Sequence, residues 1–174
     1  MASWSVQFCA ASSASQLLSG ALIVVVCVLF AGCAVGLSLF DIREHRLPNR
    51  IVYPWAGVTA GLLLFISLLA GEPGAFGRSV LSGIVWGAAL AMTRLIRPPP
   101  LGMGDVKLAV VLGMHAGYAG WSVLGGAVVL SFLFGGAASV VLLLSGRVSR
   151  RARIPFGPFL LAGTASAIVL CWGP

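Results

Sequence analysis

Residues 17–40 are LLSGALIVVVCVLFAGCAVGLSLF, a run without a single charged side chain. As a helix with a rise of about 1.5 Å per residue, this run is long enough to cross the ~30 Å hydrocarbon core of a bilayer. It is followed by DIREHRLPNR at residues 41–50, the most densely charged stretch of the chain. This pattern predicts a membrane-spanning helix that ends near Asp41.

The composition of the whole chain is that of a membrane protein. Of its 174 residues 59% are hydrophobic and 9% are charged, against roughly 25% charged residues in soluble proteins. Long continuous apolar runs disfavour a transmembrane β-barrel, whose strands alternate polar and apolar residues over about ten positions. We therefore predict an all-α, polytopic membrane protein with a short extracytoplasmic lead at residues 1–16 and a single domain at residues 17–174.

The remaining apolar runs predict five further spans, which gives a bundle of six transmembrane helices. They lie at about residues 51–70, 79–96, twice within 106–145 with a turn near 115–121, and from about 159 to Trp172. The stretch 106–145 crosses twice because one helix of that length would be about 60 Å long. Residues 71–78 are predicted to be a loop, and Tyr53 and Trp55 to be interfacial anchors.

Glycines at i, i+4 spacing predict places where helices pack closely, because they have no side chain to keep the backbones apart. The pairs are Gly32/Gly36, Gly57/Gly61, Gly83/Gly87 and Gly113/Gly117.

The distribution of positive charge predicts the orientation of the bundle. The net charge of +7 would suggest nucleic acid as a partner of a soluble protein, but here the basic residues lie in short loops. Six spans place the 41–50, 94–107 and 146–158 loops on one side, with ten of the eleven Lys and Arg residues; only Arg78 lies on the other. Because cytoplasmic loops are rich in Lys and Arg, we predict that these loops are cytoplasmic and both termini are outside. The expected surroundings are membrane lipid, without nucleic acid.

Two aspartates are expected to share that cytoplasmic face. Asp41 ends the first span, and Asp105 lies in LGMGDVK, residues 101–107, at the start of the fourth. An ionisable group at a membrane is costly to hold, so it suggests a function. Two carboxyl groups in a small, partly dry site do not both ionise easily, so one keeps its proton while the other acts as a base. Such a pair can activate water against a peptide carbonyl and protonate the leaving amine, without metal or cofactor.

Structural interpretations of the same aspartates stay open at this stage. Asp105 fits the N-cap of the fourth span as well as it fits catalysis, and Asp41 is able to form a surface ion pair with Arg43 or Arg46. A non-enzymatic assembly or transport component is the alternative function. The glycines beside Asp105 are expected to take unusual backbone dihedrals and to let an extended substrate approach.

Other site patterns are weak or missing in the sequence. Asp41, Glu44 and His45 would form a metal cluster only if the first helix continued towards Pro48, so no metal is predicted. No His-Glu-x-x-His or Gly-x-Ser-x-Gly motif is present. His115 is interpreted as an interfacial turn residue.

Three motifs together resemble the type IV prepilin peptidase family, a branch of the Gly-x-Gly-Asp intramembrane aspartyl proteases. Asp41 followed by LPN at residues 47–49 resembles the first motif of that family, and GMGDVKL at residues 102–108 resembles the second. IPFGPF at residues 154–159 resembles the motif that precedes the last helix. The motifs occur in the family's order, and the resemblance covers residues 20–172.

The resemblance implies an aspartic endopeptidase of the bacterial inner membrane with Asp41 and Asp105 as its catalytic pair. Its substrates would be type IV prepilins or prepilin-like pseudopilins, whose basic leader is removed at the cytoplasmic face before pilus or secretion-system assembly. The remaining motif residues are expected to position the site or the substrate: Pro48, Asn49, Gly102, Gly104, Lys107, Pro155, Gly157 and Pro158. Larger members carry a further domain with a four-cysteine motif and N-methylate the product. Without that motif, the chain resembles the short, peptidase-only form, and a preflagellin-type peptidase is a close relative.

Overall fold

The computed structural model describes residues 2–44, 48–93, 95, 102–145 and 155–171, with the side chains of residues 2–13, 42–44 and 171 outside the description. These residues form helices α1 (Ala2–Glu44), α2 (Asn49–Ala70), α3 (Pro73–Thr93), α4 (Met103–Ala119), α5 (Trp121–Leu144) and α6 (Gly157–Cys171), and no strand occurs among them. Helices α1, α2, α3 and α5 are long and apolar enough to cross a membrane, and α6 is a shorter apolar helix. The predicted all-α, polytopic membrane architecture is confirmed.

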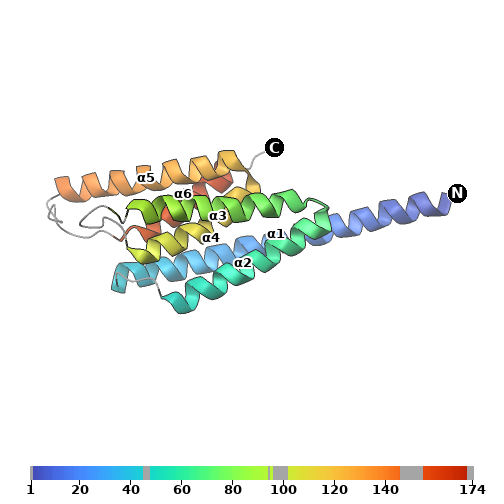
Figure 1. The fold of residues 1–174 in the computed structure, drawn as a ribbon, viewed down its shortest axis with the longest axis horizontal. Helices are drawn as coiled ribbons and strands as arrows, with labels where there is room; N and C mark the ends of the chain where they lie inside the picture. The colour runs from blue at the N-terminus through green and yellow to red at the C-terminus, as the bar shows by residue number, and fades with distance from the viewer. Residues whose placement is uncertain (1, 45–47, 94, 96–101, 146–154, 172–174) are drawn as a thin grey trace.

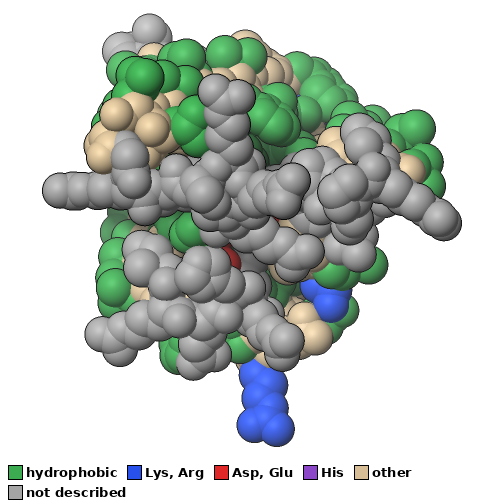
Figure 2. Space-filling view, turned by 90° about the vertical axis from the view of Figure 1, so that its left-hand side faces the viewer, with side chains coloured by type: hydrophobic (Ala, Val, Ile, Leu, Met, Phe, Trp, Pro, Cys, Tyr) green, Lys and Arg blue, Asp and Glu red, His purple; other side chains and the backbone are tan. Residues whose placement is uncertain are grey.

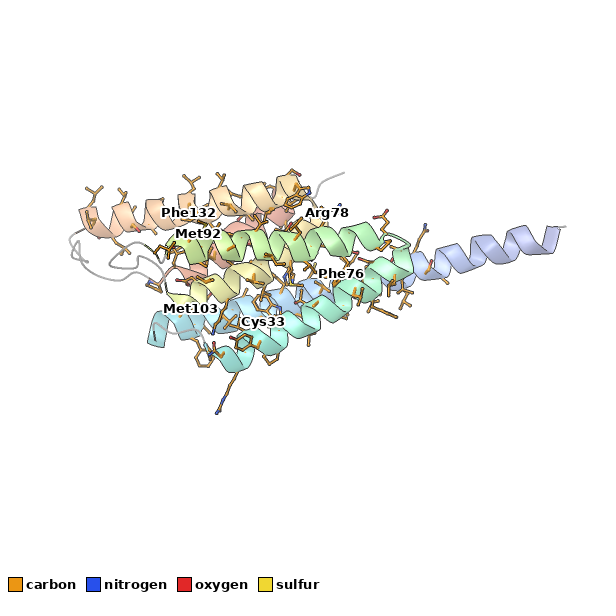
Figure 3. The ribbon with its side chains drawn as sticks, viewed as in Figure 1. Cys33, Phe76, Arg78, Met92, Met103 and Phe132 are labelled. Carbon is orange, nitrogen blue, oxygen red and sulfur yellow. The ribbon has the colours of Figure 1, made fainter. Side chains whose placement is uncertain are left out.

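The helices lie side by side along one axis, so the bundle has two ends (Figure 1). We call the end that holds the first residues of α2, α4 and α6 the motif end, because the three sequence motifs adjoin it. The opposite end holds the short connections from α2 to α3 and from α4 to α5, and the first part of α1 extends beyond it. Met103 lies at the motif end and Arg78 lies toward the opposite end (Figure 3).

Helix α4 is the central element of the bundle. Nearly every residue from Asp105 to Gly117 is buried, and α4 packs against α2, α3, α5 and α6. Its most extensive contact is with α3, where a Cβ atom added at Gly113 would lie only 2.8 Å from the Cα atom of Gly83. The packing of α4 therefore needs glycine on both sides of this interface.

Two of the four predicted glycine pairs mediate close helix packing. Added Cβ atoms at Gly83, Gly87, Gly113 and Gly117 would all collide with the facing helix. The prediction is wrong for the pairs in α1 and α2, since Cβ atoms there would meet nothing within 4 Å. Close packing between α5 and α6 instead uses Gly163, which faces Ser131, and Gly135 on α5 lies against the ring of Phe156, just before α6. Neither glycine belongs to an i, i+4 pair that the sequence singled out.

One predicted loop at the opposite end is wrong. Helix α3 begins at Pro73, so the predicted loop 71–78 shrinks to Gly71 and Glu72. Helix α1 begins at Ala2, so the segment predicted as a short lead is helical. Gly71 ends α2 in the left-handed conformation with φ 70°, and proline suits the first position of the next helix because it has no N–H to satisfy. Arg78, on α3, donates hydrogen bonds of 2.8 Å to the carbonyls of Gly117 and Tyr118 at the end of α4.

The turn between α4 and α5 lies at Gly120, within the predicted region, and has a φ of 153°. His115, however, is buried inside α4, where its ring lies 5.1 Å from that of Phe30 and 5.6 Å from that of Trp55. Trp55 is also buried, so only Tyr53 of the two predicted anchors is exposed. Both interpretations failed because α1 and α2 cover this face of α4, which the sequence alone does not reveal.

Candidate active site

Asp41 lies in the last turn of α1 and is only 5% exposed. Its Oδ2 atom accepts a hydrogen bond of 3.0 Å from the backbone N–H of Gly157, the first residue of α6. A carboxylate at the end of its own helix opposes that helix's dipole, but the N-terminus of another helix attracts it. Helix α6 therefore compensates for the unfavourable position of Asp41 on α1.

Gly157 leaves room for this contact. A Cβ atom added to it would lie 2.6 Å from Oδ2 of Asp41, closer than real Cβ atoms approach. Any side chain at position 157 would therefore displace the carboxylate or the start of α6.

Aromatic packing fixes the start of α6. The carbonyl of Phe156 accepts the N–H groups of Phe159 and Leu160, and its ring packs against Gly135 on α5 and lies 5.4 Å from the ring of Phe132. Pro155, which precedes it, is half-buried, and Pro158 occupies the first turn of α6, where proline is tolerated. The closing motif thus holds the Gly157 N–H group in place beside Asp41.

Asp105 lies in the first turn of α4 and is 8% exposed. The N-cap of α4 is Gly102, whose N–H donates a 3.2 Å hydrogen bond to Oδ2 of Asp105. Asp105 is the third residue of α4 and caps the helix from that position. The structural alternative, in which Asp105 itself is the N-cap residue, is therefore wrong. Gly102 has ordinary extended dihedrals of φ −72° and ψ 156°, so the expected unusual conformation is wrong for it. Gly104 is the second residue of α4 and is half-buried.

The carboxyl groups of Asp41 and Asp105 lie close enough for their charges to repel each other. Both are more than 90% buried, and both accept a backbone N–H at the start of a helix. Figure 2 looks onto the motif end and shows an acidic side chain in the middle of this face, among side chains that the structure does not describe. The fold therefore brings together two aspartates from α1 and α4.

Lys107 contacts two residues of α2. Its Nζ atom donates a 2.9 Å hydrogen bond to Oδ1 of Asn49 and lies 4.9 Å from the ring centroid of Tyr53. Pro48 is the N-cap of α2, with its carbonyl accepting the N–H groups of Ile51 and Val52 at 3.0 and 3.3 Å. The first and second motifs are thus joined by direct contact. The contact between Lys107 and the ring of Tyr53 was not predicted from the sequence. Tyr53 follows Asn49 by four positions and therefore lies on the same helix face, which was the available signal.

The described part of the chain contains no group of three or more His, Cys, Asp or Glu residues placed to hold a metal ion. The weak cluster of Asp41, Glu44 and His45 falls outside this test, because the side chain of Glu44 and the whole of His45 are not described. The same holds for Arg43 and Arg46, the predicted ion-pair partners of Asp41.

The model of the type IV leader peptidase family matches residues 23–144, which include both aspartates and most of the bundle. This chain belongs to that family. The third motif lies after the matched region, so its contact with Asp41 is an observation of the structure alone.

Curated relatives include two prepilin leader peptidase/N-methyltransferases. The chain is 34% identical to the one from Burkholderia pseudomallei over 146 residues, 80% of this chain and 45% of that protein. It is 34% identical to the one from Pseudomonas aeruginosa over 143 residues, 80% of this chain and 46% of that protein. The chain thus spans about half the length of these relatives. Leader peptidase HopD from Escherichia coli is 32% identical over 150 residues, 83% of this chain and 90% of that protein. No solved structure gives a significant match.

Proposed function

We propose that this chain is an aspartic endopeptidase in which Asp41 and Asp105 form the catalytic pair. The observation that carries the proposal is the approach of two buried carboxyl groups, from α1 and α4, in an otherwise apolar bundle. Burying two like charges near each other is costly unless one of them is protonated, and a pair in which one carboxyl group keeps its proton suits acid–base hydrolysis. A pair with only a structural role would gain nothing from this repulsion.

The proposed chemistry follows from the pair. One carboxylate takes a proton from water as the water oxygen attacks the peptide carbonyl, and the protonated partner donates its proton as the C–N bond breaks. Backbone N–H groups of Gly157 and Gly102 hold the two side chains without supplying a competing acid. No covalent intermediate is needed.

The proposed substrates are prepilins or prepilin-like proteins, since three relatives are named for leader peptidase activity. We propose that cleavage occurs at the cytoplasmic face of the inner membrane, because the positively charged segments are joined in sequence to helix ends that lie at the motif end. HopD, which the chain matches over most of its length, is named as a leader peptidase only. The proposal is therefore confined to cleavage and does not include N-methylation.

The test is cleavage of a basic-leader prepilin that is co-expressed with the chain and followed as a size shift on a gel. Asp41→Asn and Asp105→Asn should each lower the cleavage rate by at least about 10²-fold, the usual contribution of one general acid or base. The amide keeps the size of the side chain, so loss of cleavage reports on chemistry.

Glu72→Gln is the matched control, because Glu72 is an exposed acidic residue at the opposite end of the bundle. It should cleave at the wild-type rate. Cleavage by either aspartate variant at the wild-type rate would refute the proposed pair. Well-inserted wild-type protein that cleaves none of several prepilins would refute the proposed substrate class.

A further inference from the structure

Lys107 carries a positive charge near the start of α4 that its described contacts do not neutralise. Its Nζ atom donates a hydrogen bond to Oδ1 of Asn49 and lies over the ring of Tyr53. An amide oxygen and an aromatic ring are both uncharged. An ammonium group has three N–H donors, and the hydrogen bond to Asn49 uses one of them. Lys107 therefore keeps both charge and donors for a further, anionic partner.

Arg50 adds a second positive charge beside this contact. It is exposed on the first turn of α2 and precedes Tyr53 by three positions, so the two side chains are neighbours on the helix surface. Tyr53 itself is 56% exposed. We call Asn49, Arg50, Tyr53 and Lys107 the α2–α4 basic cluster. Figure 2, which looks onto the motif end, shows Lys and Arg side chains in the lower part of this face.

The length of α2 places this cluster at the level of the lipid headgroups. Helix α2 has 22 residues, which at about 1.5 Å per residue just exceeds the ~30 Å hydrocarbon core. Its first turn therefore lies at the boundary between acyl chains and headgroups. Beyond Tyr53, the exposed side chains of Val58 and Phe65 continue an apolar surface along α2. An anionic group bound to the cluster would thus adjoin a surface that acyl chains cover.

The geometry favours a lipid over a substrate peptide as this anionic partner. Lys107 follows Asp105 by two positions, and residues at this spacing on a helix do not face each other. Arg50 and Tyr53 lie on α2, which carries neither of the two aspartates. The cluster therefore lies on a different face of α4 from the carboxyl group of Asp105.

We propose that the α2–α4 basic cluster binds the phosphate of an anionic phospholipid, whose acyl chains lie along the exposed apolar face of α2. Lys107 and Arg50 supply the attraction that basic residues near a membrane surface exert on anionic lipid. Tyr53 has the amphipathic ring that is enriched at this level of the membrane. The site does not depend on the proposed function of the aspartates.

The test uses phosphatidylglycerol with a diazirine in one acyl chain as a photolabel on the purified full chain in nonionic detergent, with adducts located by mass spectrometry. Labelling should concentrate on residues 53–65 of α2. Unlabelled phosphatidylglycerol should compete about fivefold better than phosphatidylcholine, whose headgroup has no net charge. Equal competition by the two lipids would show an ordinary lipid-facing surface and would overturn the proposal. Displacement of the label by a prepilin peptide in place of phosphatidylglycerol would assign the cluster to the substrate and would also overturn it.

Two variants test the cluster itself. Arg50→Gln and Lys107→Gln should each lower the labelling of α2 about fivefold at subsaturating lipid, because each removes one positive charge. Arg50 is exposed, so its variant tests the site even if Lys107→Gln fails to fold. Arg78→Gln is the matched control, because it removes one positive charge toward the opposite end, and it should leave this labelling unchanged. Unchanged labelling in Arg50→Gln, or an equal loss in Arg78→Gln, would overturn the proposal.

Discussion

Both aspartates are held by backbone groups at the starts of helices. Asp41 accepts the N–H of Gly157 on α6, and Asp105 accepts the N–H of Gly102 on α4. Helix N-termini attract negative charge, so this arrangement lets two carboxyl groups be buried in an apolar bundle. The two carboxyl groups also repel each other. The hydrogen bonds from the backbone N–H groups of Gly102 and Gly157 therefore help to hold the side chains in position.

Gly157→Ala is expected to lower the cleavage rate by about 10²-fold, the effect of a misplacement of roughly 1 Å at a catalytic group. The added Cβ atom would lie 2.6 Å from Oδ2 of Asp41 and must push the carboxylate away. Steady-state cleavage of a prepilin by purified protein measures the effect. Gly136→Ala on α5 is the control, since its Cβ atom meets nothing within 4 Å, and it should retain wild-type cleavage. Equal rates for the two variants would contradict the proposed role of Gly157.

The position of the two aspartates at one end of the bundle could be predicted from sequence, because they are rare charges at the ends of apolar runs. The Asp41–Gly157 contact was not, because it joins residues 116 positions apart in sequence and depends on how α6 packs. The glycine in the closing motif was a signal that something approaches closely there, but sequence alone does not say what. The same limit explains His115, whose burial depends on the covering helices α1 and α2.

At the scale of helices, the contact between Lys107 and Asn49 links the starts of α4 and α2. The ammonium group also lies over the ring of Tyr53, which adds a cation–π attraction. Because α2 follows the segment after Asp41, this link is expected to set the position of α4, and with it Asp105, relative to α1. Lys107 is therefore interpreted as a positioning residue.

Lys107→Met and Asn49→Leu are expected to be non-additive, with a coupling energy of about 1 kcal/mol for a hydrogen bond to a charged group near solvent. A double-mutant cycle of unfolding free energies in detergent measures this coupling. Asn49→Asp keeps an acceptor oxygen for Lys107 and should retain the coupling that Asn49→Leu loses. Additive effects of the two substitutions on stability would show that the contact does not stabilise the bundle.

The element order could be predicted from sequence, but several boundaries could not. Gly71, Glu72 and Pro73 suggested a long loop, yet a left-handed glycine followed by a helix-starting proline makes a very short turn. Glycine spacing predicted the α3–α4 contact and failed for α1 and α2, because the same pattern occurs on surfaces that face open space. The spacing of glycines does not indicate which face of a helix packs against a neighbouring helix.

At the scale of the whole molecule, the two ends of the bundle differ in charge. In the sequence, charged segments follow α1 and precede α4 and α6, and the adjoining ends of these helices lie at the motif end. Arg78 lies on α3 toward the opposite end. Its guanidinium is engaged by the carbonyls of Gly117 and Tyr118, so this exception serves the end of α4. The distribution of ten basic residues in the segments on one side against one on the other supports the proposed cytoplasmic position of the motif end.

This orientation predicts opposite accessibility for single cysteines at the two ends. In a variant whose four native cysteines are replaced, Leu95→Cys should be labelled by a membrane-impermeant maleimide only after the cytoplasmic membrane is opened. Glu72→Cys should be labelled in intact spheroplasts, because both side chains are exposed but lie beyond different ends of α3. The reverse pattern would place the motif end outside and exclude cleavage at the cytoplasmic face, while leaving the chemistry of the aspartate pair untouched. Arg78→Gln should not alter the labelling pattern, because the ten remaining basic residues still lie in segments assigned to the cytoplasm.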